Sequence, residues 1–310
     1  MWWISVALAY EKDQLTDRQI PLPDALPAAD AKMNEVLAEA IAATNARTQC
    51  RATDDRTRDV LTREIVDRAA GSHPVPHRGV PRSFGYGQYS GWLETTDRVE
   101  RREFLDRDDL FGPVTVGESV VLSLAGVCST VRFGDHLLGT DKLDHFLDTG
   151  YHYTKRRTPQ AAIRYGTRTE RSYYGLWTSK AFSYADLAAN HAGYRFYSEL
   201  LSDASVARRG ADGCVTQVAP FTWAAWITDE FDEVRSPSSY TRKVGAVVRA
   251  HIVSEPERYC PAWEALGGEA YDASLVDLPI PGYVGAKHPP RADPYGLGDV
   301  CRGADPQSDR

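Results

Sequence analysis

The sequence lacks the features that mark several common protein classes. No apolar run approaches the roughly 20 residues that a membrane-spanning helix needs. There is no CxxC pair, no His-Glu-x-x-His helix motif, no Gly-x-Ser-x-Gly elbow and no phosphate-cradling glycine loop. These absences disfavour membrane proteins, zinc knuckles, serine hydrolases and P-loop enzymes. We therefore expect no membrane segment, no metal and no cofactor.

An excess of positive charge is also missing. The chain carries 36 Lys and Arg against 43 Asp and Glu, for a net charge of -7. Such a balance gives no general field for phosphates, although Lys155, Arg156 and Arg157 form a local basic run. We expect no nucleic-acid partner. With 42% hydrophobic and 25% charged residues, the 310-residue chain has the composition of a soluble globular protein, expected to be a monomer.

Cysteine is sparse, and the N-terminus is apolar. The first nine residues, "MWWISVALA", end in a small-x-small pattern but lack a basic n-region, so they suggest a signal-peptide remnant or, alternatively, a buried strand. Five widely spaced cysteines permit one or two disulfides with one thiol left over. They are Cys50, Cys128, Cys214, Cys260 and Cys301. We expect a secreted or periplasmic protein, and the pairing stays open.

Helical periodicity dominates the chain, with little β structure. Two early helices are expected at 28–46 and 53–70, the second capped by Thr53. Further helices are expected at 142–156, 159–172, 184–201, 222–234 and 239–253. The pattern at 114–139 fits strand or buried helix equally. Residues 72–95 and those after 267 are rich in Gly and Pro and predict irregular segments.

Two of these helices contain a glycine in mid-run followed by a tyrosine: Gly150 with Tyr151, and Gly193 with Tyr194. A glycine inside a helix costs about 1 kcal/mol relative to alanine, so a close approach of another group is expected there. That group is either a neighbouring helix or a ligand resting on the floor of a cleft.

Glu170 is the residue that points most directly to chemistry. It lies in the last turns of the 159–172 helix, where the helix dipole and burial both disfavour a carboxylate anion. Aromatic residues follow closely, among them Tyr173, Tyr174 and Trp177. A glutamate that stays protonated in such surroundings can act as a general acid. The alternative is a solvated helix glutamate paired with a neighbouring arginine.

A metal site is the other chemical interpretation. His145 and His152 are seven residues apart on one helix, with Asp141 and Asp148 four residues before each. A metal-dependent hydrolase centred on Asp141, His145 and His152 is therefore an alternative function.

Several ordered stretches resemble a lysozyme family known from predatory and related bacteria, whose catalytic core is similar to goose-type lysozymes and soluble lytic transglycosylases. The stretches are "GTDKLDHF" (139–146), "GYHY" (150–153), Glu170 with "YGL" (174–176), and "FSYADLAANHAGYRFY" (182–197). The likeness extends loosely over residues 14–260. This chain departs from the pattern at Asp144, where a glycine is expected, and in a shorter interval after Glu170.

The resemblance implies an α+β, mainly helical fold: a lysozyme-like core with a short β-hairpin after the catalytic helix, and irregular N- and C-terminal extensions. The implied divisions are 1–9, a signal remnant; 10–135, a helical and irregular region; 136–260, the catalytic core; and 261–310, a C-terminal wrap. Glu170 falls on the catalytic glutamate. The expected substrate-binding residues are Tyr151, Ser172, Tyr173, Tyr174, Gly175, Leu176, Thr178, Asn190 and Tyr194; the tyrosines among them would stack on sugar faces.

The implied function is a glycosidase that cleaves peptidoglycan glycan strands, acetylated or deacetylated, by general-acid catalysis from Glu170. Hydrolysis and formation of an anhydrosugar product both remain open. Asp141, Asp148 and Asp186 are the nearest candidates for a second carboxylate, and the sequence distinguishes none of them. A non-catalytic cell-wall-binding protein on the same frame is a further alternative, because a fold does not establish an activity.

Overall fold

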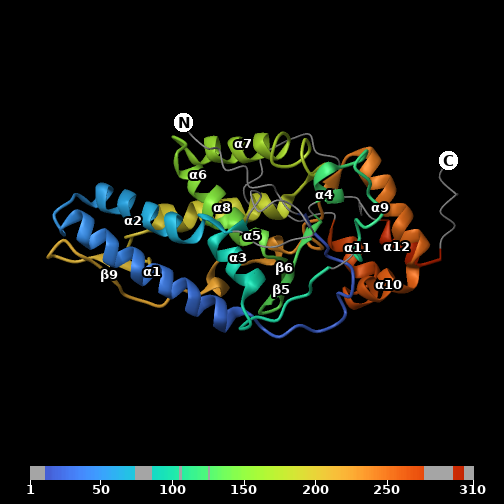
Figure 1. The fold of residues 1–310 in the computed structure, drawn as a ribbon, viewed down its shortest axis with the longest axis horizontal. Helices are drawn as coiled ribbons and strands as arrows, with labels where there is room; N and C mark the ends of the chain where they lie inside the picture. Colours follow the sequence, from blue (N-terminus) through green and yellow to red (C-terminus); the bar gives the residue numbers. More distant parts are fainter. Residues whose placement is uncertain (1–10, 74–85, 105–106, 125, 276–295, 304–310) are drawn as a thin grey trace.

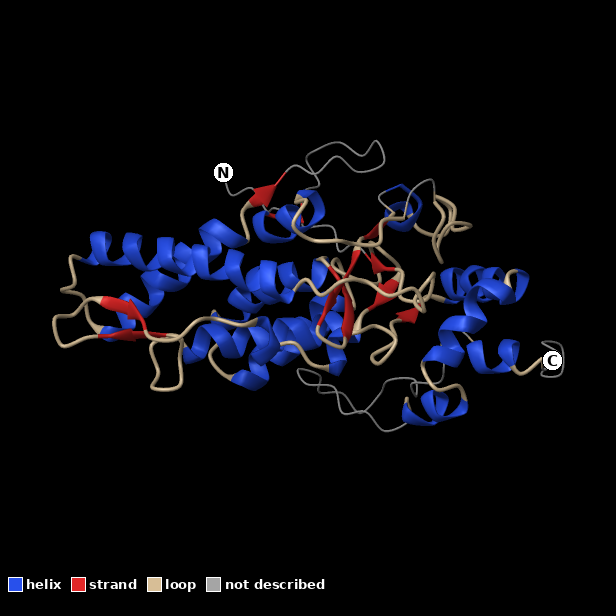
Figure 2. Cartoon of the chain, turned by 90° about the horizontal axis from the view of Figure 1, so that it is seen from below, coloured by secondary structure: helices blue, strands red, loops and turns tan. Residues whose placement is uncertain are grey.

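The computed structural model describes residues 11–73, 86–104, 107–124, 126–275 and 296–303. This part of the chain is mainly helical, with short strands near the middle of the molecule and also at the end that holds α1 and α2 (Figure 2). Helices α1 and α2 lie at one end of the long axis, α3, α5 and α8 in the middle, and α9, α10 and α12 at the other end (Figure 1). The expected mainly helical α+β class is confirmed. The expected signal remnant at 1–9 lies outside the described residues.

The two early helices are confirmed as α1 (Leu26–Thr48) and α2 (Asp54–Ala69). Helix α1 buries the periodic face that its sequence predicts, including Met33, Leu37 and Ile41. Helix α2 begins as expected at Thr53, whose side-chain oxygen accepts a hydrogen bond from the N–H of Arg56 at 3.4 Å. The two helices pack against each other as an antiparallel pair.

The three central helices also form where expected. The first runs from α5 (Asp141–Asp144) through the π-helical segment η1 (His145–Thr149) into α6 (Gly150–Thr154). The others are α7 (Pro159–Glu170) and α8 (Tyr184–Glu199). Thr158 caps α7 by accepting from Ala161 N–H, and Ser183 caps α8 by accepting from Asp186 N–H, both at 3.1 Å. Periodicity alone did not predict the π-helical segment.

Close helix packing explains the two mid-helix glycines. A Cβ on Gly150 would stand 2.7 Å from the Cα of Gly193, and a Cβ on Gly193 would overlap the carbonyl oxygen of Phe146. The first central helix and α8 therefore meet backbone to backbone at this point. Of the two interpretations of these glycines, the structure supports the approach of a neighbouring helix.

The strands form five two-stranded pairs among the described residues. The pairs are β1 (Glu11–Lys12) with β4 (Val127–Cys128), β2 (Ser72–His73) with β3 (Tyr86–Gly87), β5 (Thr130–Phe133) with β6 (His136–Gly139), β7 (Ala181–Phe182) with β10 (Ser239–Tyr240), and β8 (Ala207–Arg209) with β9 (Val215–Gln217). The stretch 114–139, which fitted helix and strand equally, contains both: α4 (Val120–Leu124), then β4, β5 and β6.

The expectation of a β-hairpin after α7 is wrong. Strand β7 pairs with β10, about sixty residues later, instead of with a local partner. The chain between α7 and β7 folds into tight turns, in which Leu176 N–H donates to the carbonyl of Glu170 and Thr178 N–H to that of Gly175, both at 3.0 Å. Because these turns occupy the residues between α7 and β7, no second strand forms there to pair with β7.

Three further expectations need correction. Residues 88–95 form helix α3 (Gln88–Thr95) instead of an irregular segment, because Asp144 accepts hydrogen bonds from Gly87 N–H and the Ser90 hydroxyl at its start. The expected helix at 222–234 is not formed; the segment contains only the 3-10 turns η2 (Trp223–Ala225) and η3 (Asp229–Phe231), and Trp223 is fully buried in the core. The region after 267 contains α11 (Glu269–Ser274) and α12 (Leu297–Cys301).

Helix α9 (Arg242–Ser254) confirms the 239–253 prediction, and α10 (Pro256–Ala265) follows it directly. The two large hydrophobic clusters of the described residues both contain residues from early and late parts of the chain. The first cluster lies under α1, α8 and η2, and its members include Leu37, Leu143, Phe146, Phe196 and Trp223. The second lies under α9 and α10, and its members include Leu15, Phe111, Val127, Val234 and Tyr259. No helix of the described residues is long and apolar enough to cross a membrane.

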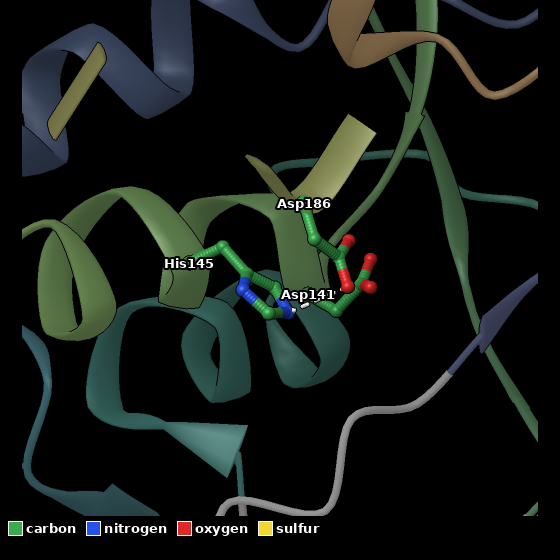
Figure 3. Close-up of side chains that lie close together, drawn as sticks. All are labelled: Asp141, His145 and Asp186. Carbon is green, nitrogen blue, oxygen red and sulfur yellow. Dashed lines mark ion pairs between the residues drawn. The ribbon is translucent and has the colours of Figure 1, made fainter. Parts of the chain in front are cut away.

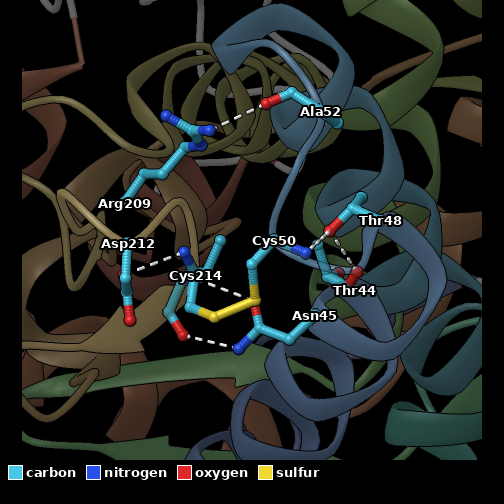
Figure 4. Close-up of a disulfide and its surroundings, with 9 residues drawn as sticks. Thr44, Asn45, Thr48, Cys50, Ala52, Arg209, Asp212 and Cys214 are labelled. Carbon is cyan, nitrogen blue, oxygen red and sulfur yellow. Dashed lines mark hydrogen bonds between the residues drawn. A yellow bond between two sulfur atoms is a disulfide. The ribbon is translucent and has the colours of Figure 1, made fainter.

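Two disulfides confirm the expectation of one or two bridges with a thiol left over. Cys50 pairs with Cys214, and Cys260 with Cys301, while Cys128 is free and buried. The first bridge joins the turn after α1 to the β8–β9 hairpin, where Arg209 also donates to the carbonyl of Ala52 at 2.9 Å (Figure 4). Such bridges fit an oxidising compartment.

Candidate active site

Glu170 is the last residue of α7, and its side chain turns into the protein. The residue is only 2% exposed. Its Oε1 accepts a hydrogen bond from the backbone N–H of Ser183, at the start of α8, at 3.0 Å. Glycine is required at position 175, because a Cβ there would stand 2.5 Å from the same oxygen. The solvated glutamate paired with an arginine, the alternative that the sequence left open, is therefore wrong.

Burial and a neighbouring charge both act on this carboxyl. Burial is the larger effect and the anionic Asp186 the second; together they raise the pKa of Glu170 to about 8. The Ser183 hydrogen bond and the positive charges of His145 and Lys142 act in the opposite direction. Glu170 is therefore mainly protonated at neutral pH, as a general acid must be.

Asp186 lies in the first turn of α8 and is the anionic partner of this acid. Its Oδ2 is 3.0 Å from the Nε2 of His145, and the Nδ1 of that imidazole is 3.1 Å from the Oδ1 of Asn190, one turn further along α8. Burial opposes the charge on Asp186, but His145 and Lys142 outweigh it and hold its pKa well below the usual range. Burial likewise disfavours the charged form of His145, yet Asp186 raises the pKa of that imidazole to about 9.

Lys142 supplies the central positive charge. Its ammonium nitrogen lies 2.6 Å from Asp141, 2.7 Å from Asp186 and 2.6 Å from Glu233, and all four side chains are almost fully buried. Burial disfavours the ammonium ion, but the three carboxylates raise the pKa of Lys142 well above its usual value. We call Asp141, Lys142, His145, Asp186 and Glu233 the ionic cluster.

Three members of the ionic cluster also meet the geometric requirement for a metal site. Ligand atoms of Asp141, His145 and Asp186 all lie within 4.8 Å of one another, and the imidazole of His145 points at Asp186 (Figure 3). Lys142, however, already provides the cation between the two aspartates, and a metal would have to share that space with an ammonium ion. The third expected ligand, His152, is 44% exposed and pairs with Asp148 at 3.6 Å.

The polar candidates around Glu170 bond mainly to local backbone. The hydroxyl of Ser172 donates to the carbonyl of Arg168 at 2.8 Å, and that of Thr178 to the carbonyl of Tyr174 at 3.0 Å. Leu176 is half-buried and packs against the small cluster of Phe182, Tyr184 and Leu187. These residues shape the connection between α7 and β7 that holds the acid in place.

The aromatic candidates are more exposed than an aromatic-lined crevice would require. Tyr173 is 40% exposed and Trp177 is 70% exposed. The rings of Tyr173 and Tyr174 lie 4.4 Å apart between centroids. Tyr151 and Tyr194 are half-buried, on α6 and α8 respectively. The structure brings Glu170, Gly175 and Asn190 close to the ionic cluster, and places Tyr151, Tyr173 and Tyr194 at the protein surface.

Sequence reasoning missed Lys142 and Glu233 as parts of the site. Lys142 stands between Asp141 and Leu143 in the predicted helix, where a lysine is normally solvated, and no local pattern indicates that it is buried. Glu233 lies in a stretch predicted as helix. Glu11, on β1, is also buried, and burial first, then Glu233 and Asp186, raise its pKa well above the usual value. Only the tertiary structure brings these groups together.

A described pocket lies elsewhere, at the β5–β6 turn. Its lining includes Phe133, Asp135, His136 and Ile227, and none of the ionic cluster contributes to it. This pocket is therefore not part of the site around Glu170.

Comparisons with models of protein families, with curated proteins and with solved structures found no match.

Proposed function

We propose that this chain is a lysozyme-like glycoside hydrolase that cleaves the glycan strands of peptidoglycan, with Glu170 as its general acid. The supporting observation is the state of that carboxyl: it is buried, held by the N–H of Ser183, and has a pKa raised to about 8. The resemblance of residues 139–197 to a lysozyme family supports the choice of substrate.

In this mechanism the glycosidic oxygen takes the proton of Glu170 as positive charge develops on the sugar ring. Before the reaction, Asp186 keeps Glu170 protonated, because its negative charge would repel an ionised Glu170. Since Asp186 is bound by both His145 and Lys142, it is a weak base and acts through its charge. We therefore assign it no role as the activator of water.

The direct test replaces Glu170 with glutamine and measures muropeptide release from purified sacculi by mass spectrometry. We expect turnover to fall by at least about 100-fold, within the range that a general acid supplies, while binding to sacculi is retained. Wild-type turnover should also decline as pH rises through about 8, because Glu170 then loses its proton.

The matched control is Glu264→Gln, which removes the same charge from an exposed position on α10. It should leave turnover unchanged. Equal turnover in the Glu170→Gln variant and the wild type would refute the proposal. No release of muropeptides by the wild-type protein, with binding intact, would favour the non-catalytic cell-wall binder instead.

The grouping of Asp141, His145 and Asp186 favours a metal-dependent hydrolase as a second candidate. That candidate predicts a stoichiometric divalent ion in purified protein and activity lost to a chelator. The glycosidase proposal predicts turnover unaffected by chelation. Metal analysis together with a chelator assay therefore separates the two.

We place the proposed activity outside the cytoplasm, in a secreted or periplasmic protein. Peptidoglycan lies there, and the disulfides Cys50–Cys214 and Cys260–Cys301 are stable under oxidising conditions.

A further inference from the structure

The segment that contains Glu170 has a charge opposite to that of the whole chain. Residues 149–185 include seven Lys and Arg but a single acidic residue, Glu170, whereas the full sequence has a net charge of -7. Because the side chain of Glu170 is buried and mainly protonated at neutral pH, it does not offset these charges. The segment therefore presents a concentrated positive surface.

The positive charges lie on the solvent side of α7 and of the segment that joins α6 to it. Arg164 and Arg168 are four residues apart on α7 and share one face, and Arg157 precedes the extended N-cap Thr158, just before the helix begins. The opposite face of α7 buries Ala162, Gly166 and Glu170. In Figure 1, α7 runs along the edge of the molecule, outside α6. All three arginines are exposed.

These three arginines form no ion pairs with the part of the chain that the structure describes. No carboxylate there lies within 4 Å of the guanidinium groups of Arg157, Arg164 or Arg168. Surface charges elsewhere on the chain are commonly paired, as in Arg63 with Asp59 at 3.2 Å. Unpaired cations gathered on and just before one helix repel one another, and an external anion relieves that repulsion.

Aromatic rings organise the other two cations of this surface. The ammonium group of Lys155 lies 4.1 Å above the ring of Tyr151 and 3.9 Å from Asp59 Oδ1, and the guanidinium group of Arg156 lies 3.6 Å above the ring of Tyr165. Stacking of this kind fixes the position of a charged group and lowers the entropy lost when it binds a ligand. We call Lys155, Arg156, Arg157, Arg164 and Arg168 the basic face.

We propose that the basic face binds the carboxylate groups of a peptidoglycan strand, an inference that rests on the proposed function. Arginine binds carboxylates through two parallel hydrogen bonds. Helix α7 has 12 residues and is about 18 Å long, and the basic face extends from the segment before it to Arg168 near its end, so these charges match a polymer better than a single sugar. A strand bound along α7 would extend toward the end of the helix that carries Glu170.

This proposal also sets a preference of substrate. Removing acetyl groups from the aminosugars creates ammonium groups on the strand, and these would be repelled by the basic face. Acetylated strands that keep their carboxylates should therefore bind more tightly than deacetylated ones.

The test measures binding to purified sacculi by co-sedimentation in the Glu170→Gln background, so that the polymer stays intact. The double variant Arg164→Glu/Arg168→Glu should bind at least tenfold more weakly and depend less on salt. The control Arg242→Glu/Lys243→Glu makes the same change of charge at exposed positions of α9 and should stay within twofold of its parent. Circular dichroism and thermal unfolding verify that both variants fold.

Two further ligands identify what is bound. Chitin oligosaccharides share the aminosugar backbone but have no carboxylates, so their binding should not respond to Arg164→Glu/Arg168→Glu. An equal loss in both double variants, or no loss in either, would overturn the inference. So would binding of single-stranded DNA that depends on the arginines when binding of sacculi does not. Arginine-dependent binding without turnover by the wild type would refute only the proposed function.

Discussion

At the scale of single side chains, one hydrogen bond stabilises the charged form of Glu170, while the surroundings of the carboxyl destabilise it. The N–H of Ser183 favours the charged form of the carboxyl, but burial and Asp186 favour the protonated form more strongly. A carboxyl kept protonated in this way reduces the stability of the folded protein at any pH where it would ionise freely in water. Sites that hold such groups commonly exchange stability for function.

The stability of the protein should therefore depend on pH through Glu170. In the unfolded chain this residue ionises near 4.5, and in the folded protein at about 8. Between these values Glu170 binds more protons in the folded state than in the unfolded state, so its contribution to the free energy of unfolding falls as pH rises, by about 1.4 kcal/mol per pH unit. Glu170→Gln replaces the titrating carboxyl with a neutral amide, so position 170 no longer contributes to the pH dependence of the free energy of unfolding. The variant should gain stability over wild type steadily between pH 4.5 and 8, measured by urea unfolding.

Glu264→Gln serves as the control, because it makes the same substitution at an exposed position on α10. A constant difference in stability between Glu170→Gln and wild type at pH 4.5, 6 and 8 would contradict the shifted pKa. It would also remove the main support for the general-acid proposal.

The position of Glu170 in its helix could be predicted from the sequence, but only some of the residues around its carboxyl could. Its place at the end of a helix follows from periodicity and from Thr158-Pro159 at the start of that helix. The state of its carboxyl depends on burial, on Asp186 from α8, and on Lys142 and His145 from the first central helix. Local patterns carry no information about which distant charges meet, so the ionic cluster could not be predicted.

At the scale of secondary-structure elements, the contact between the first central helix and α8 determines where the site residues lie. Gly150 and Gly193 let the two backbones touch, and the carbonyl of Phe146 in η1 occupies the space beside Gly193. This contact fixes the distance between His145 on η1 and Asn190 on α8, which interact at 3.1 Å. A π-helical segment widens the helix locally and is often found near functional sites.

Gly193→Ala should accordingly be strongly destabilising. Its new methyl group would overlap the Phe146 carbonyl, and a backbone atom cannot move aside as a flexible side chain can. Overpacking of this kind costs about 3 kcal/mol. We expect a fall of that size in the free energy of unfolding, measured with urea. The shift of α8 should also reduce turnover if Asn190 and Asp186 support Glu170.

The matched control for this substitution is Gly245→Ala on α9, where the nearest atom to a new Cβ is 3.6 Å away on the side chain of Tyr240. Alanine should be neutral there or stabilising by up to about 1 kcal/mol, because it favours helix. If Gly193→Ala behaved like Gly245→Ala, the close backbone contact would be wrong.

The elements that the sequence predicted well are those with a local cause. Thr53, Thr158 and Ser183 each accept the expected capping hydrogen bond. The failures have distant causes: α3 begins where Gly87 and Ser90 donate to Asp144, about fifty residues later. Likewise the strand after α7 pairs with β10 instead of forming a hairpin.

At the scale of the whole molecule, two hydrophobic clusters meet near the ionic cluster. Leu143, next to Lys142, belongs to the first cluster, and Val234, next to Glu233, belongs to the second. Burying four charges is costly unless they are paired, and the pairing at Lys142 requires all of its partners to be in place. The relative position of the two clusters is thereby coupled to the geometry around Glu170.

The two disulfides act at this same scale, each closing a long loop of chain. Cys50–Cys214 spans 164 residues and Cys260–Cys301 spans 41. The loss of chain entropy in the unfolded state predicts stabilisation of about 5 and about 4 kcal/mol respectively. We expect Cys50→Ser/Cys214→Ser to lower the free energy of unfolding slightly more than Cys260→Ser/Cys301→Ser, measured with urea at one pH.

Thiol titration tests the pairing itself before any variant is made. Unfolded, unreduced protein should expose one reactive thiol, that of Cys128, and reduction should raise the count to five. The native protein should react slowly, since Cys128 is buried and donates to Asp141 at 3.2 Å. Five thiols without reduction would show that neither bridge forms, and the argument for an oxidising compartment would then fail together with the predicted loss of stability.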